Sequence, residues 1–215
     1  MLVRRTALII PAFNEEDSIF DVVKGASTYG DVIVVNDASK DQTSTLATLA
    51  GAHVLEHSQN LGYESALNSG FAYAATQAYD YIITLDADGQ HAPLLLTHFI
   101  RALDEGAELV VGRRSRLQRW SESIFSLVGR VLWGISDPLC GMKGYRLSSV
   151  RAPEASDNLS LIGTKLMVQM IRSDARIVEV PITTRTRKGP SRFGSGVSVN
   201  LQVMKALITH LITSH

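Results

Sequence analysis

The chain has one cysteine, no excess of either charge and no long apolar run. Cys140 alone excludes an internal disulfide framework and any zinc site built from several cysteines, which favours a reducing compartment. We interpret it as a packed small residue rather than a reactive thiol. Lysine plus arginine and aspartate plus glutamate both number 21, so no overall field favours nucleic acid as a partner.

Segments that could cross a membrane are also missing from the sequence. No stretch reaches the ~18 apolar residues that a membrane-spanning helix requires. The opening segment MLVRRTALIIPAF has an apolar run too short for a secretory signal, and Pro11 interrupts it. We therefore expect a cytoplasmic protein that is soluble or lies peripherally on the cytoplasmic face of a membrane.

What the sequence does contain is a regular alternation of strand and helix patterns, unbroken as far as Gly112, which is typical of βαβ units. With 215 residues and 45% hydrophobic content, the chain is large enough for one full core. We predict a single α/β domain over residues 1–215, with a Rossmann-like, mainly parallel sheet flanked by helices and an amphipathic C-terminal helix. The predicted strands are Ala7–Ile10, Asp31–Val35, His53–Glu56, Tyr81–Leu85, Glu108–Gly112, Met142–Leu147 and Ile177–Ile182.

The segment Tyr81–His91 carries the main candidate site. Asp86 and Asp88 follow an apolar run, at the carboxyl end of a predicted buried strand, where open α/β sheets bind ligands. Alternation along an extended chain would point both side chains to the same side. Such a pair suits Mg²⁺ or Mn²⁺, completed by substrate phosphates and water. A solvated acidic turn is the alternative interpretation of a bare D-x-D motif.

Polar residues follow the other predicted strands as well. Because parallel strands bring their carboxyl ends to one edge of a sheet, the turns after them should share one cleft. The residues collected in this way are Asn14, Glu15, Asp37, Asp86, Asp88 and Gln90. We therefore predict a polar ligand site along this edge.

An arginine-rich segment precedes an apolar helix that we predict over Trp120–Ser136. This order is typical of a helix that lies in a membrane interface, and equally of a core helix after a solvated basic turn. The arginines are Arg113, Arg114, Arg116 and Arg119.

A second basic segment, Thr183–Gly196, combines cations with glycines and contains no acid. It is either a mobile loop that clamps phosphate or a solvated charged loop. Its cations are Arg185, Arg187, Lys188 and Arg192. The helix predicted after it, Val197–Ile212, either packs on the domain or anchors it to a surface.

Six blocks in order and spacing give the chain a wider resemblance. The set resembles glycosyltransferase family 2, and within it the transferases that move a sugar to dolichyl or other polyprenyl phosphates. The blocks are PAFNEE (11–16), VVNDASKDQT (34–43), NLGYESALNSG (60–70), DADGQH (86–91), VVGRRSR (110–116) and DPLCGMKGYR (137–146). The resemblance implies a GT-A fold, a nucleoside-diphosphate sugar donor such as a GDP- or UDP-sugar, and a divalent metal, Mg²⁺ or Mn²⁺.

The resemblance also implies roles for individual residues. Those of the donor pocket are Pro11, Ala12, Asn14, Glu15, Asn36 and Asp37. Those that hold metal and diphosphate are Asp86, Asp88 and Gln90. Arg114 and Arg130 correspond to contacts with the acceptor phosphate, and Asp137 and Arg146 to the acceptor-side acid and arginine. A homo-oligomer is left open.

The chain departs from the family pattern at two places. The paired acids after the second strand appear as Asn36-Asp37, and the N-x-G-K-G-x-A block has Tyr63 and Glu64 but no lysine. These changes keep open a protein that binds nucleotide sugars with little turnover. If the acceptor is a glycan or other hydroxyl instead of a lipid phosphate, Asp137 is the candidate general base. A nucleotidyltransferase would need a Gly/Lys/Arg-rich phosphate loop after the first strand, which PAFNEE lacks.

Overall fold

The computed structural model describes residues 4–117, 119–150 and 162–185. Its strands are β1 (Thr6–Ala12), β2 (Asp31–Asn36), β3 (His53–Glu56), β4 (Tyr81–Thr84), β5 (Leu109–Arg114), β6 (Lys143–Arg146) and β7 (Ile177–Ile182). Its helices are α1 (Ile19–Ala26), α2 (Thr43–Leu49), α3 (Tyr63–Ala75), α4 (Leu95–Asp104), α5 (Trp120–Trp133), the short η1 (Leu147–Ser149) and η2 (Ile162–Leu166), and α6 (Met167–Arg172). The alternation predicted from the sequence is confirmed, although α1 begins later than the turn after Pro11 suggested.

The strands form one seven-stranded sheet in the order β3-β2-β1-β4-β6-β5-β7. Neighbouring strands run parallel except at β6, which is antiparallel to both β4 and β5. The mainly parallel sheet is therefore confirmed. Since β6 runs in the opposite direction, its first residue, Lys143, lies at the carboxyl edge of the parallel strands.

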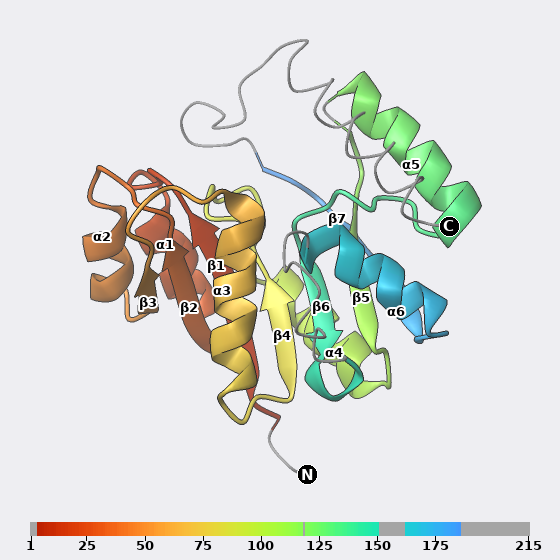
Figure 1. The fold of residues 1–215 in the computed structure, drawn as a ribbon, viewed down its shortest axis with the longest axis horizontal. Helices are drawn as coiled ribbons and strands as arrows, with labels where there is room; N and C mark the ends of the chain where they lie inside the picture. Colours follow the sequence, from red (N-terminus) through yellow and green to blue (C-terminus); the bar gives the residue numbers. More distant parts are fainter. Residues whose placement is uncertain (1–3, 118, 151–161, 186–215) are drawn as a thin grey trace.

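Helices cover both faces of this sheet (Figure 1). Along β1, Leu8 and Ile10 pack in a cluster with α1, α2 and α4, whereas Ala7 and Ile9 pack on the other face with α3 and α6. Because side chains alternate across a strand, β1 needs apolar residues at every position to fill both layers. This explains its continuous apolar run, which is buried from Thr6 to Ala12.

Pro11 does not end the first strand, contrary to the prediction. It remains in β1 and pairs with Val35 of β2. On its other side, β1 pairs with β4 only as far as Ile9. Pro11 has no backbone N–H to donate, and it lies beyond this pairing, so no hydrogen bond to β4 is lost. The strand thus continues to Ala12, which accepts a hydrogen bond from the backbone of Asp37 at 2.9 Å.

Helix α5 lies beyond the carboxyl edge of the sheet (Figure 1). It ends three residues earlier than predicted, because Gly134 adopts a left-handed φ of 68° and caps it. Among the described helices, none is long and apolar enough to cross a membrane. The predicted helix Val197–Ile212 lies outside the described residues.

Candidate active site

The segments that follow β1 and β2 are joined at the carboxyl edge. Asn14 donates its backbone N–H to Ser39 Oγ at 2.9 Å, and its side-chain oxygen accepts the backbone N–H of Lys40 at 2.8 Å. Asn14 has a φ of 53°, a conformation that asparagine tolerates better than most residues. The structure thus brings together the residues expected in the donor pocket: Pro11, Ala12, Asn14, Glu15, Asn36 and Asp37.

Asp37 is buried and held by three donors. Its Oδ1 accepts the N–H of Leu61 at 2.8 Å and lies 2.7 Å from His57 Nδ1, while Oδ2 accepts the N–H of Gly62 at 2.7 Å. The other ring nitrogen of His57 lies 2.8 Å from Ser69 Oγ on α3. Sequence reasoning missed His57 and Ser69, because no local pattern connects them to Asp37. Together these contacts fix the orientation of the carboxylate.

The asparagine that replaces an acid at position 36 has a structural explanation. Asn36 Nδ2 donates to Glu56 Oε2 at 2.6 Å, and Ser44 donates its hydroxyl to the other oxygen of Glu56. An aspartate at position 36 would place a second carboxylate against Glu56. The departure from the family pattern is therefore matched by an acid at the end of β3.

The D-x-D segment leaves β4 in a turn rather than in an extended chain. Asp88 Oδ1 accepts the backbone N–H of Gln90 at 3.0 Å, and Gly89 adopts a φ of 73°. The extended chain that the alternation argument assumes ends at Thr84, before both acids. Asp88 is buried, whereas the Asp86 side chain is 31% exposed. Gln90 Nε2 donates to the carbonyl of Arg185 at 3.3 Å.

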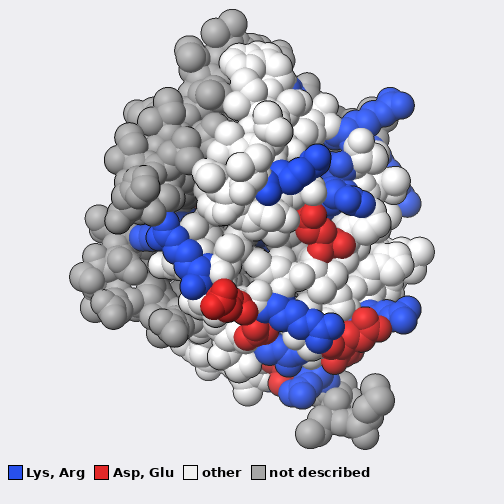
Figure 2. Space-filling model, turned by 90° about the vertical axis from the view of Figure 1, so that its right-hand side faces the viewer, with Lys and Arg blue, Asp and Glu red and all other residues white. Residues whose placement is uncertain are grey.

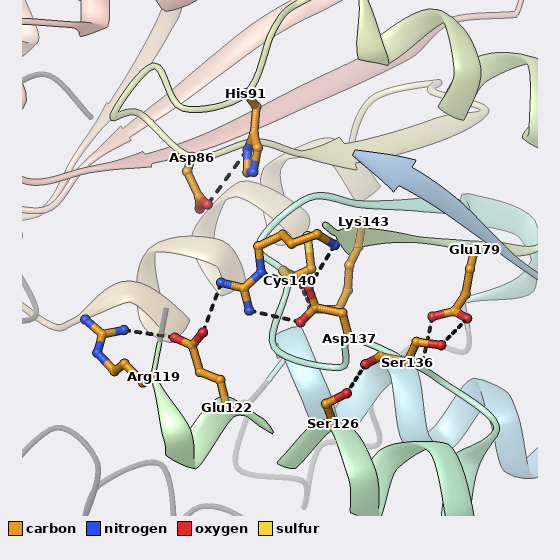
Figure 3. A network of polar contacts seen from close by, with 11 residues as sticks. Asp86, His91, Arg119, Glu122, Ser126, Ser136, Asp137, Cys140, Lys143 and Glu179 are labelled. Carbon is orange, nitrogen blue, oxygen red and sulfur yellow. Dashed lines mark hydrogen bonds and ion pairs between the residues drawn. The ribbon is translucent and has the colours of Figure 1, made fainter. Parts of the chain in front are cut away.

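Three residues surround the carboxylate of Asp86. Tyr63 donates its hydroxyl to Oδ1 at 3.1 Å, and burial, followed by the charge of Asp86, raises the pKa of Tyr63 well above its usual value of 10.0. His91 Nδ1, which is buried, lies 3.9 Å from Oδ2 (Figure 3) and makes no hydrogen bond within the described part of the chain. Gly141 packs against the carboxylate itself.

The donor atoms here suit a hard divalent cation. Two carboxylates and an amide oxygen, from Asp86, Asp88 and Gln90, are of the kind that Mg²⁺ and Mn²⁺ prefer. Residues 4–117, 119–150 and 162–185 contain no group of three or more His, Cys, Asp or Glu arranged to hold a metal.

Arg114 and Asp137 form a buried ion pair, and Asp137 is labelled in Figure 3. Arg114 Nε and Nη2 donate to Asp137 at 2.7 and 2.9 Å, and Glu122 lies 3.5 Å from Nη1. Burial alone would lower the pKa of Arg114, but the hydrogen bonds and charge of Asp137 raise it above its usual value. Glu122 also pairs with Arg119 at 3.0 Å. The antiparallel β6 explains this proximity, because the loop before it reaches the same edge.

Sequence reasoning missed Lys143, a buried cation at the start of β6. Its Nζ donates to the carbonyl of Cys140 at 2.6 Å. Burial lowers the pKa of Lys143, although the nearby groups act to raise it. These groups are Cys140, Glu64, Asp137 and Asp86. Burial, with the charge of Asp137, raises the pKa of the Cys140 thiol to about 12, which agrees with its interpretation as a packed residue.

Two predicted arginines lie away from this network. Arg146, at the far end of β6, pairs with Tyr81 at the start of β4, and its guanidinium donates to the carbonyls of Leu103 and Ala107. It therefore lies at the opposite edge of the sheet from Asp137. Arg130 is exposed in the last turn of α5, about 12 Å along the helix from Glu122.

The predicted phosphate loop is described only at its start. Arg185 donates its backbone N–H to the carbonyl of Gln90 at 2.8 Å, so the loop begins beside the D-x-D turn. The other cations of the loop, Arg187, Lys188 and Arg192, lie outside the described residues.

The fold is of the GT-A type. The chain resembles the solved structure of glucosyl-3-phosphoglycerate synthase from Mycobacterium tuberculosis in complex with Mn²⁺, UDP and glucosyl-3-phosphoglycerate. The TM-score is 0.75 and the identity 22%, over 96% of this chain and 79% of that one. A likeness at this identity establishes the shared fold.

The chain belongs to glycosyltransferase family 2. Residues 7–121 match the family model described as "Glycosyl transferase family 2". The chain is 32% identical to the undecaprenyl-phosphate mannosyltransferase of Micrococcus luteus, over 90% of this chain and 89% of that protein. It is 30% identical to the polyprenol monophosphomannose synthase of Mycolicibacterium smegmatis, over 86% and 79% of the two chains.

Proposed function

We propose that this enzyme transfers a sugar from a GDP- or UDP-sugar to a polyprenyl phosphate, using Mg²⁺ or Mn²⁺. The names of the relatives support the acceptor class, because the protein of Micrococcus luteus is an undecaprenyl-phosphate mannosyltransferase. The crystallised Mycobacterium tuberculosis protein, which binds Mn²⁺ and UDP, supports a metal and a nucleotide donor. The shared edge of β1, β2 and β4 supports a single donor site.

The observation that carries the acceptor class is the pairing of Asp137 with Arg114. A hydroxyl acceptor needs a general base, and Asp137 was the candidate for it. With its side chain 3% exposed and both oxygens hydrogen-bonded to Arg114, Asp137 is poorly placed to accept a proton from an acceptor. A phosphate monoester has a second pKa near ~6 and is mostly a dianion at neutral pH, so it attacks without a strong base.

The chain's own residues then have separate tasks. Asp86, Asp88 and Gln90 would hold the cation, which stabilises the negative charge of the departing diphosphate. Asp37, fixed by His57 and two backbone amides, orients the nucleoside part of the donor. We include the basic loop from Arg185, with Arg187, Lys188 and Arg192, as a clamp on the phosphates.

Helix α5 supplies the side that would face a lipid. Its exposed apolar residues recur on one face: Trp120, Ile124, Leu127 and Val131. The view toward α5 in Figure 2 is largely free of acid in its upper part, with cations at the border. The acid within α5, Glu122, is buried and paired, whereas Arg130 is exposed. These features suit the surface of an anionic membrane, where the acceptor would lie.

A donor panel with two acceptors tests the proposal. UDP- and GDP-sugars are incubated with Mn²⁺ and either a short polyprenyl phosphate or a soluble hydroxyl acceptor, and product is measured by chromatography. We expect transfer to the phosphate, its loss in excess chelator, and a decrease of about 100-fold or more in Asp88→Asn. Asp17→Asn, at an exposed position, is the control and should be fully active.

Two results would overturn the proposal. Full activity in excess chelator would show that the reaction requires no divalent cation. If the enzyme transfers sugar only to the hydroxyl acceptor, and Asp137→Asn abolishes this transfer, then Asp137 is the general base and the acceptor is not a lipid phosphate.

A further inference from the structure

Asp86 is held by fewer groups than Asp37 and Asp137, two other carboxylates at this edge. Asp37 accepts from two backbone amides and contacts His57, and Asp137 is bound at both oxygens by Arg114. Within the described ranges, the hydrogen bond to Asp86 comes from the hydroxyl of Tyr63, at 3.1 Å. Since the Asp86 side chain is 31% exposed, its orientation depends strongly on this one contact.

Gly141 confines the carboxylate from another side. A Cβ at this position would lie 2.5 Å from both oxygens of Asp86, so the loop backbone is in direct contact with the carboxylate. Gly141 does not adopt a left-handed φ, and space rather than backbone conformation therefore explains this glycine. The hydroxyl of Thr84 donates to the Gly141 carbonyl at 2.6 Å and holds this backbone in place.

His91 faces the second oxygen of Asp86 without fixing it. Its Nδ1 lies 3.9 Å from Oδ2, beyond hydrogen-bond distance (Figure 3). The imidazole therefore limits the space around the carboxylate but does not select its orientation. That selection falls to Tyr63, the first residue of α3, because its hydroxyl contacts one lone pair of Oδ1 and leaves the others for a cation.

We propose that Tyr63 is a positioning residue that orients the Asp86 carboxylate for a divalent cation, with Gly141 as the surface against which the carboxylate rests. The inference rests on the metal site of the proposed function. Groups that hydrogen-bond a metal ligand set its orientation, and their removal typically weakens metal binding by 10- to 100-fold. Tyr63 would act on the cation through Asp86 and make no contact with the reacting atoms.

The test is direct Mn²⁺ binding, measured by electron paramagnetic resonance of the free ion, with MnCl₂ alone and with MnCl₂ plus UDP. We expect Tyr63→Phe to weaken Mn²⁺ binding by about tenfold or more. In turnover, the Mn²⁺ concentration for half-saturation should rise by a similar factor while kcat at saturating Mn²⁺ stays near wild type. Tyr73→Phe is the matched control on the same helix, because Tyr73 stacks on His53 and is expected to leave binding unchanged.

A second variant tests the same carboxylate from its other side. Gly141→Ala should displace Asp86 and also weaken Mn²⁺ binding, and thermal unfolding of each variant checks that the fold is kept. Wild-type affinity in folded Tyr63→Phe would overturn the inference and leave the metal site standing. If the wild-type protein binds no Mn²⁺ with or without UDP, the proposed metal site fails and the inference fails with it.

Discussion

The side chains of Arg114 and Asp137 are joined by two parallel hydrogen bonds, of 2.7 and 2.9 Å, at the carboxyl edge of the sheet, and the backbone N–H of Arg114 adds a third at 3.1 Å. Both side chains are largely buried, at 14% and 3% exposed. A buried pair of this kind is costly to break, because the remaining charge keeps its desolvation penalty and loses its partner.

We therefore predict that Asp137→Ala lowers the free energy of unfolding by about 3 kcal/mol. Asp137→Asn should lose less, since its amide oxygen still accepts a hydrogen bond. Urea denaturation measures both. Asp31→Ala is the control, because it breaks an exposed pair with Arg5 and should change stability by less than about 1 kcal/mol. Equal losses in Asp137→Ala and Asp31→Ala would contradict the buried role of the pair.

The contact between Asn36 and Glu56 predicts a charge conflict in a variant. Asn36→Asp would set two carboxylates against each other where Asn36 Nδ2 now donates to Glu56 at 2.6 Å. We expect a loss of about 1 kcal/mol at pH 7, which shrinks as the pH falls and carboxyl groups take up protons. Thermal unfolding of Asn36→Asp, Glu56→Gln and the double variant measures the coupling. The double variant should recover most of the stability lost in Asn36→Asp. If the stability losses of the two single variants simply add, the two carboxylates do not repel each other.

The apolar face of α5 predicts binding to anionic membranes. Leu127 and Val131 are 62% and 75% exposed, so changing both to glutamate should reduce co-sedimentation with phosphatidylserine vesicles while thermal unfolding stays nearly unchanged. Leu49→Glu is the matched control, because Leu49 is 69% exposed on α2. Arg130→Glu should weaken binding mainly at low salt, since each cation near such a surface contributes about 1 kcal/mol. Wild-type protein that stays in the supernatant at low salt would contradict the prediction.

The buried thiol of Cys140 predicts a loss of stability in alkali. Its pKa rises from 9.0 to about 12 in the folded protein, so the folded state keeps its proton where the unfolded chain has released it. Stability from this group is present below pH 9 and is lost as the pH rises from about 9 to 12. Cys140→Ala should flatten this part of the profile, as measured by urea denaturation across pH. A thiol reagent at pH 8 should modify wild-type protein only after unfolding, and rapid modification of folded protein would contradict its burial.

Much of the fold followed from local patterns in the sequence. Short apolar segments that alternate with helical repeats predicted the strands from β1 to β5, because a strand covered on both faces needs apolar residues throughout. Parallel order then predicted that the turns after β1, β2 and β4 meet at one edge, as Asn14, Asp37 and Asp86 do.

The direction of β6 was decided only by the tertiary structure. Its four residues, Lys143–Arg146, have no pattern that fixes how a strand between β4 and β5 should run. Running antiparallel, β6 brings Asp137 to Arg114 and carries Arg146 to the opposite edge. Contacts between distant segments, such as Asp37 with His57 and Tyr63 with Asp86, also depend on how whole layers pack, and no local spacing encodes them. The sequence by itself thus determined the elements and the edge that holds the site, whereas long-range packing decided which charges at that edge pair with each other.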